Sequence, residues 1–168
     1  TFSYRWSRAV QHHPVRALLV GGTFLLVLAL PALSLRLGFP DEGNQPEGAD
    51  PRQAYDLLAE GFGPGFNGPI LLAARLPEGT DPAVLERVTE AVGADEGVEA
   101  VTPAIPNDGE APTAVVWRII PTSAPQDEAT GELVSRLRSD VLPAATAGDL
   151  DVSVTGGVAV GIDFSDYL

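Results

Sequence analysis

The longest apolar run in the chain covers residues 17–35 and contains no charged side chain. As a helix rising 1.5 Å per residue, this run would be about 28 Å long, close to the roughly 30 Å hydrocarbon thickness of a bilayer. Gly21, Gly22 and Pro31 interrupt the run, and such residues are more frequent in membrane helices than in soluble ones. The pattern therefore predicts a transmembrane helix over residues 16–36.

Charge on either side of this run predicts its orientation. Arg5, Arg8 and Arg16 come before or at its start, and the chain becomes acidic soon after its end. By the positive-inside rule, residues 1–15 form a cytoplasmic lead-in, and residues 37–168 are extracytoplasmic, anchored at the plasma membrane. Two other interpretations stay open: a signal peptide with a cleavage site near "ALPALS", and a buried core helix of a soluble protein.

Residues 37–50 are acidic and rich in glycine and proline, which predicts a linker. A helix then follows over about 51–60. Asp50 is the expected N-cap, Gln53 completes an approximate capping box, and Gly61 is the expected terminator with positive φ.

The pattern from residue 69 onward alternates strands with amphipathic helices. Short apolar or alternating runs predict strands at 69–76, 98–102, 113–120 and 150–156, and 3.6-residue periodicity predicts helices at 81–93 and 125–143. Asp81 is the expected cap of the first helix, and residues 106–112 read as a hairpin loop. The resulting β-α-β-β-α-β order predicts an α+β fold of ferredoxin-like type, an antiparallel sheet with two helices on one face.

Composition narrows the function classes. Residues 41–168 hold six arginines and all 23 acidic residues, which gives a formal net charge of −17, so no nucleic-acid partner is expected. There is no cysteine, which excludes disulfides and the usual zinc ligand sets.

The stretch "GPGFNG" at 63–68 matches the glycine fingerprint of dinucleotide-binding loops. That fingerprint requires a strand before the glycines and a helix after them, so that the helix N-terminus faces the pyrophosphate. Here a predicted helix comes first and a strand follows. We therefore interpret the stretch as a helix stop and positive-φ connection, with Phe62 and Phe66 as packing anchors.

No catalytic or metal site is expected. The histidines are His12 and His13, on the predicted cytoplasmic side, so a Ser-His-Asp triad cannot form in the exported part. Asp163 and Asp166 could suggest a calcium or acid pair, but their spacing fits no loop motif and solvated acids are the expected outcome. We expect no enzyme activity and no cofactor.

Three segments together resemble one family: "RQAYDLLAEGFGPGFNGP" (52–69), "PTSAPQDEATGELVSRLR" (121–138) and "VTGGVAVGIDFSDYL" (154–168). They are similar to the MMPL (mycobacterial membrane protein large) family, within the resistance–nodulation–division (RND) superfamily of exporters. "RWSRAVQHHPVRALL" (5–19) resembles the lead-in to the first helix of the second half of such a protein.

The resemblance implies that this chain is a fragment of a proton-motive-force-driven exporter of lipids or hydrophobic drugs. Residues 51–160 would form a porter domain with its core at about 69–156, and 161–168 would begin the return to the membrane. Its partners would be the lipid or hydrophobic substrate, the membrane, and the remaining helices and second porter domain. Proton-relay residues would lie in later helices, outside this chain.

Porter domains of the superfamily line the substrate path, and the candidates for this role are Phe62, Phe66 and Trp117, each of which could instead be a core residue. The alternative function is a single-pass, membrane-anchored extracytoplasmic module for binding or scaffolding.

Overall fold

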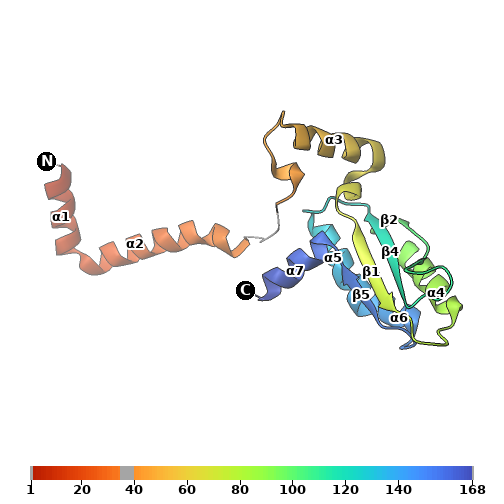
Figure 1. The fold of residues 1–168 in the computed structure, drawn as a ribbon. Coiled ribbons are helices and arrows are strands. Elements are labelled where there is room, and N and C mark those ends of the chain that lie inside the picture. Colours follow the sequence, from red (N-terminus) through yellow and green to blue (C-terminus); the bar gives the residue numbers. More distant parts are fainter. Residues whose placement is uncertain (1, 35–39, 168) are drawn as a thin grey trace. The chain divides into compact units, whose positions relative to one another are not determined.

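The computed structural model describes residues 2–34 and 40–167, drawn as a ribbon in Figure 1. The chain divides into two compact units, Thr1–Leu37 and Gly38–Leu168. Each unit is described by itself below.

The first unit is helical. It contains α1 (Phe2–His12), α2 (Pro14–Ala29) and the 3-10 turn η1 (Leu30–Ser34). Pro14 occupies the first turn of α2, where its missing N–H costs no hydrogen bond. The stretch Pro14–Leu33 is long and apolar enough to cross a membrane. None of its most apolar part is buried, whereas the core helix of a soluble protein would be mostly buried. The end of the predicted 16–36 span lies outside the described residues.

The second unit is an α+β domain built on an antiparallel sheet. Its strands are β1 (Ile70–Arg75), β2 (Val98–Val101), β3 (Ile105–Pro106), β4 (Ala114–Pro121) and β5 (Val152–Thr155). Hydrogen bonding gives the order β2-β4-β1-β5, with the short β3 paired to β4. Figure 1 looks onto the sheet, where β1 and β4 lie side by side.

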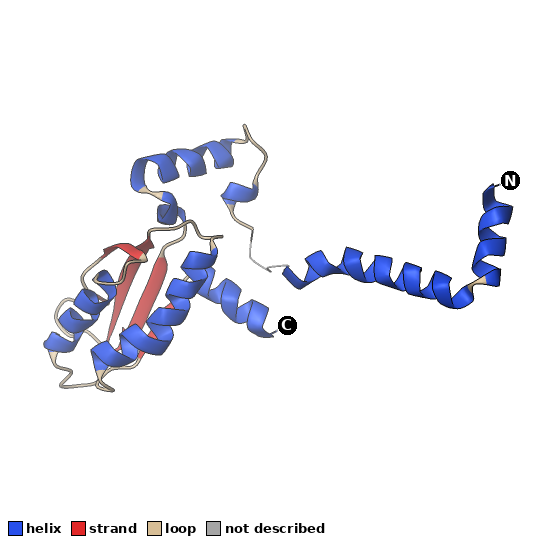
Figure 2. Ribbon diagram, turned by 180° about the vertical axis from the view of Figure 1, so that it is seen from behind, coloured by secondary structure: helices blue, strands red, loops and turns tan. Residues whose placement is uncertain are grey.

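Helices cover one face of this sheet, as Figure 2 shows from behind. They are α4 (Pro82–Gly93), α5 (Glu128–Arg136), the π-helical segment η4 (Leu137–Val141) and α6 (Leu142–Thr146). Before the sheet come the 3-10 turn η2 (Glu42–Asn44), α3 (Asp50–Phe62) and the 3-10 turn η3 (Pro64–Asn67), and α7 (Gly157–Tyr167) follows β5.

The core lies between the sheet and these helices. Strand residues alternate between buried and accessible, since successive side chains point to opposite faces. Trp117 is fully buried, and its indole Nε1–H donates to Thr89 Oγ1 of α4 at 2.9 Å, so the largest core side chain has its polar atom paired. The other fully buried large residues are Ile70, Leu72, Ile119, Leu133, Leu137, Val84, Val88, Val92 and Val134.

The predicted strands, the helix capped by Asp81 and the hairpin at 106–112 are confirmed, but the start and end predicted for α3 are wrong. Ala49, not Asp50, is its N-cap, and Asp50 lies in the first turn. Gln53 reaches back to the carbonyl of Gly48 and not to a backbone N–H. Gly61 lies inside the helix, and the residue with positive φ that ends it is Gly63, at +92°.

Two other segments differ from the prediction. The linker predicted at 37–50 carries structure from residue 41, where Asp41 caps η2. Arg52 of α3 donates to the carbonyl of Gly43 at 2.6 Å, which holds η2 on the helix. The helix predicted at 125–143 begins at Glu128 and continues through η4 and α6 to Thr146, where Ala147 turns into the left-handed region.

Candidate functional site: the open sheet face and its aromatic end

The sheet has a second face that the helices α4, α5 and α6 do not cover. On β1 and β4 it carries the residues that alternate with the buried ones, and cross-strand pairing assigns their neighbours on β2, β3 and β5 to the same side. We call this set the open face: Leu71, Ala73, Arg75, Ala100, Ile105, Ala114, Val116, Arg118, Ile120, Ser153 and Thr155.

The open face is apolar at its centre. Ile105 is 54% exposed and Val116 is 39% exposed, and these two residues are paired across β3 and β4. The charged members of the set are Arg75 and Arg118, and the exposed acid of β2, Glu99, lies at the β-bulge next to Ala100, while the unit around the face is strongly acidic. The open face therefore differs in both polarity and charge from the rest of the domain.

The glycine stretch at 63–68 delivers the chain to one end of this face. Gly63 has φ of +92°, which a residue with a side chain rarely adopts. A Cβ on Gly65 would lie 1.9 Å from the carbonyl oxygen of Pro121, and a Cβ on Gly68 would lie 2.3 Å from Pro125 Cγ. The glycines thus serve a turn and two close approaches, and η3, not a phosphate cradle, lies between them.

This turn brings Phe62 and Phe66 together. Their rings stack with centroids 4.7 Å apart and an interplanar angle of 24°. Phe62, at the end of α3, is 62% exposed, while Phe66 is half-buried. The guanidinium carbon of Arg118 lies 5.5 Å from the centre of the Phe66 ring, within the range of a cation–π contact.

A shallow pocket of about 220 Å³ lies where this aromatic pair meets the sheet. Apolar side chains make most of its wall, and Arg118 supplies the one cation among its lining residues. The lining residues are Phe66, Ala100, Val101, Thr102, Arg118 and Ile120. The arrangement can accept an apolar group and place a negative charge beside Arg118.

The candidates named from sequence do not all reach this site. Phe62 and Phe66 lie at its aromatic end, but Trp117 lies in the core on the opposite side of β4 and has no accessible surface. Asp163 is bonded to Arg138, whose Nη2 donates to its carboxylate at 2.9 Å, and this hydrogen bond lowers the pKa of Asp163. Asp166 lies in α7, and its side chain is outside the described part of the structure.

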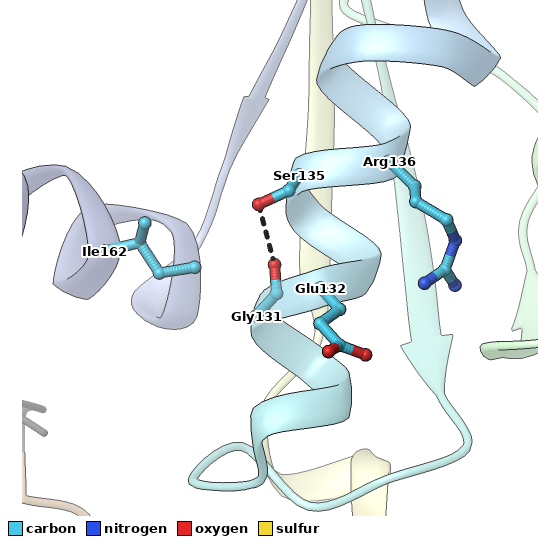
Figure 3. A pocket seen from close by; sticks show the side chains of 5 residues that line it. All are labelled: Gly131, Glu132, Ser135, Arg136 and Ile162. Atoms are coloured by element: carbon cyan, nitrogen blue, oxygen red, sulfur yellow. Dashed lines mark hydrogen bonds between the residues drawn. The ribbon is translucent and has the colours of Figure 1, made fainter. Parts of the chain in front are cut away.

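A larger hollow of about 550 Å³ lies between α5 and α7. Figure 3 shows Ile162 of α7 pointing toward α5, while Glu132 and Arg136 extend from α5 on its other side. Arg136 is already bonded to Asp95, whose pKa is lowered chiefly by that hydrogen bond. The one cation that lines this groove is therefore already paired with a carboxylate, and the groove offers less chemistry than the open face.

Sequence reasoning missed Arg118 and Arg75. A signal was present, because each is the single charged residue of an otherwise apolar strand. The contact between Arg118 and Phe66 joins residues 52 positions apart, which no local pattern reports.

No protein-family model matches the chain. It is similar to the membrane protein YdfJ of Bacillus subtilis (strain 168), with 38% identity over 166 residues, covering 97% of this chain and 22% of the relative. It is also similar to the putative membrane protein SCO6666 of Streptomyces coelicolor, with 30% identity over 166 residues, covering 98% of this chain and 21% of the relative.

The chain thus spans about a fifth of the length of the curated relatives it matches. Together with the apolar stretch Pro14–Leu33, these relatives support a membrane-associated protein with an α+β domain.

Proposed function

We propose that this chain belongs to an MMPL-type exporter of the RND superfamily, which moves lipids or hydrophobic drugs using the proton gradient. The chain would supply one membrane helix and one extracytoplasmic porter domain, and no catalysis. The observation that carries this proposal is an exposed apolar sheet face on an otherwise acidic domain, in a chain with a candidate membrane span. Contiguous exposed apolar surface is typical of sites that bind apolar partners.

The sheet connections support the ferredoxin-like form of this proposal. Helix α4 connects β1 to β2, and β4 lies between these two strands. The α5–α6 segment connects β4 to β5, and β1 lies between them. Two βαβ units that each enclose a strand of the other are the arrangement expected of a porter subdomain.

Exposed apolar residues on α3 extend the proposed substrate surface beyond the sheet. No residue of α3 is buried, and its side chains Leu57 and Phe62 are 68% and 62% exposed. Because apolar side chains at this density are unfavourable in water, we infer that lipid or another part of the transporter covers them.

The test uses the whole reading frame that encodes this chain, reconstituted into proteoliposomes with an imposed pH gradient. A fluorescent lipid and a hydrophobic dye are supplied as substrates. Transport of either compound that depends on the gradient, and stops when a protonophore removes it, is the expected result. Transport of neither compound, with or without the gradient, would argue against the exporter.

The alternative is a single-pass, membrane-anchored module for binding or scaffolding. Two results together would support this module in place of the exporter. The reading frame would encode no membrane helix besides the one in this chain, and its protein product would bind an apolar ligand saturably without transporting it.

A further inference from the structure

The arginines of the acidic unit fall into two groups. Residues 41–168 contain six. Four form ion pairs: Arg52 with Asp56, Arg87 with Asp149, Arg136 with Asp95 and Arg138 with Asp163. Within residues 40–167, as far as the structure describes them, the other two, Arg75 and Arg118, have no carboxylate partner, and both lie on the open face.

This distribution is informative because carboxylates are abundant. With 23 acidic residues on the unit, an exposed arginine has many possible carboxylate partners, and four of the six arginines form an ion pair with one of them. The two on the open face instead stand among apolar side chains. A guanidinium in such surroundings is available to an anion that arrives from outside, since its planar fork matches carboxylate and phosphate oxygens.

Arg118 and Arg75 differ in what surrounds them. Arg118 lies over the Phe66 ring and lines the 220 Å³ pocket, whereas Arg75 lies near the other end of β1. Arg118 pairs with Leu71, and Arg75 is four residues further along that strand, roughly 14 Å away at 3.4 Å per residue. One anionic head group cannot contact both.

We propose that the pocket beside Phe66 binds an anionic lipid, with its head group on the guanidinium of Arg118 and its acyl chain along the apolar centre of the open face. The inference rests on the proposed function and adds the charge class of the substrate to it. Phe66, Ala100 and Ile120 would contact the apolar part next to the head group. The Phe66 ring lies under the guanidinium carbon of Arg118, 5.5 Å from ring centre to carbon, which favours keeping this cation at the pocket.

The make-up of the pocket wall favours a lipid over a second protein as the occupant. The pocket combines one cation with apolar walls, which matches one head group joined to a chain.

The experiment uses the full chain, purified in dodecyl maltoside. The probe is a lysophospholipid with a phosphate head group and a photoreactive diazirine in its acyl chain, and the neutral match is a monoacylglycerol with the same chain. Cross-linking is measured against probe concentration, and the modified residues are located by mass spectrometry. Arg118→Gln is the test variant, and Arg75→Gln is the matched control, because it removes the same charge from the same face.

We expect the phosphate probe to cross-link the wild-type chain at the pocket or along β1 and β4. Arg118→Gln should raise its half-saturating concentration about tenfold, the range of one charge-assisted hydrogen-bonded pair. Arg75→Gln should change it less than twofold, and neither substitution should affect the neutral probe.

Three results would overturn the proposal. Equal losses in Arg118→Gln and Arg75→Gln would indicate general electrostatic attraction. An unchanged half-saturating concentration in Arg118→Gln would remove the role of that side chain. Cross-links of the wild-type chain confined to Pro14–Leu33 would place the lipid outside the pocket. This result is measured on the wild-type chain alone, so it does not depend on whether a variant folds.

The proteoliposome assay separates this inference from the proposed function. Transport by the whole protein that survives Arg118→Gln for anionic and neutral lipids alike would refute the inference and leave the exporter intact. Specific binding of the phosphate probe, in a protein that transports nothing, would refute the exporter and leave the site intact.

Discussion

At the scale of single residues, Gly65 is the position with the least room. A methyl group there would lie 1.9 Å from the carbonyl oxygen of Pro121 and 2.6 Å from its carbonyl carbon, and both atoms belong to the backbone of β4. Because the strand cannot yield without losing its own pairing, we expect Gly65→Ala to lower the free energy of unfolding by at least ~2 kcal/mol. Chemical denaturation of the chain in detergent, followed by far-UV circular dichroism, measures this loss.

Gly61→Ala is the matched control for that measurement. Gly61 lies within α3 and a Cβ there meets nothing within 4 Å. Replacing a helical glycine with alanine should stabilise the helix by about 0.5–1 kcal/mol. Equal effects of the two substitutions would show that the close approach at Gly65 is not what the structure describes.

The ion pair between Arg136 and Asp95 gives stability a defined pH dependence. Arg136 Nη2 donates to Asp95 Oδ1 at 2.7 Å, and this bond holds the pKa of Asp95 below its ordinary value. Because the folded pKa is lowered, the pair stabilises the fold above the unfolded pKa of about 3.9, and the stabilisation is lost as pH falls through the folded pKa.

We therefore expect Asp95→Asn to lower the free energy of unfolding by about 1–2 kcal/mol at pH 7. The deficit relative to the wild-type chain should shrink as the pH falls below about 4. Asp149→Asn is the control, since its pair with Arg87 is largely exposed and should contribute only a few tenths of a kcal/mol. A deficit for Asp95→Asn that is constant from pH 7 to pH 3 would contradict this account.

Residue roles were predictable only where they are local. The need for positive φ after α3 could be predicted from the glycine stretch, although it falls on Gly63 and not on Gly61. The close approaches of Gly65 and Gly68 could not, because Pro121 and Pro125 lie more than fifty residues later in the chain. For the same reason the ion pair of Asp95 with Arg136 had no signal in the sequence around either residue.

At the scale of elements, one hydrogen bond joins α4 to β4. Trp117 Nε1 donates to Thr89 Oγ1 at 2.9 Å, and the hydroxyl of Thr89 also donates to the carbonyl of Leu85. Thr89→Val keeps the shape but leaves the buried indole N–H without its acceptor, which should cost about 1–3 kcal/mol. Chemical denaturation followed by far-UV circular dichroism measures the loss.

Thr89→Ser serves as the control because it keeps the hydroxyl. It should retain most of the stability that Thr89→Val loses, apart from the packing of one methyl group. A larger loss in the serine variant would show that the methyl group, and not the hydrogen bond, holds α4 against the sheet.

Apart from the two-residue β3, the order and type of the elements from β1 to β5 could be predicted because each carries its own periodicity. Burial alternates along β1 and β4, and Asp81 caps α4 through the backbone N–H of Ala83, so pattern and structure agree there. The start of α3 was mispredicted, since Ala49 caps it while η2 packs on it through Arg52.

At the scale of the whole molecule, the basic residues before Pro14–Leu33 and the acidic residues after it predict the orientation of the chain in the membrane. Cysteine labelling can test this orientation. The chain has no cysteine, so a single introduced thiol is the only one within it, and the unsubstituted protein serves as the blank for labelling elsewhere. In intact cells of a Gram-positive host, a membrane-impermeant maleimide should label Ser139→Cys, on the exposed surface of the acidic unit. Ser7→Cys, in α1, should be labelled only after the membrane is permeabilised.

The reverse labelling pattern would place the acidic unit in the cytoplasm and contradict the orientation. Labelling of both positions in intact cells would indicate that Pro14–Leu33 does not span the membrane. Loss of residues 1–34 from the mature protein, detected by mass spectrometry, would support the signal-peptide interpretation instead.

Properties of the whole molecule were the hardest to predict from sequence. The acidic character of residues 41–168 is a count, and the sequence gives it directly. Which arginines remain without a carboxylate depends on ion pairs between residues up to 62 positions apart, such as Arg87 with Asp149. The open face therefore depends on which side of the sheet the helices cover, and the sequence pattern alone does not give that side.

Arg138 has a mechanical consequence. Its Nη2 donates to the carbonyl of Val154 in β5 at 3.1 Å and to the carboxylate of Asp163 in α7 at 2.9 Å. One side chain is thus hydrogen-bonded to both β5 and α7, which restricts movement of the helix relative to the strand. A pull applied to α7 would be transmitted into β5 and, through the pairing of Val154 with Leu72, across the sheet as force.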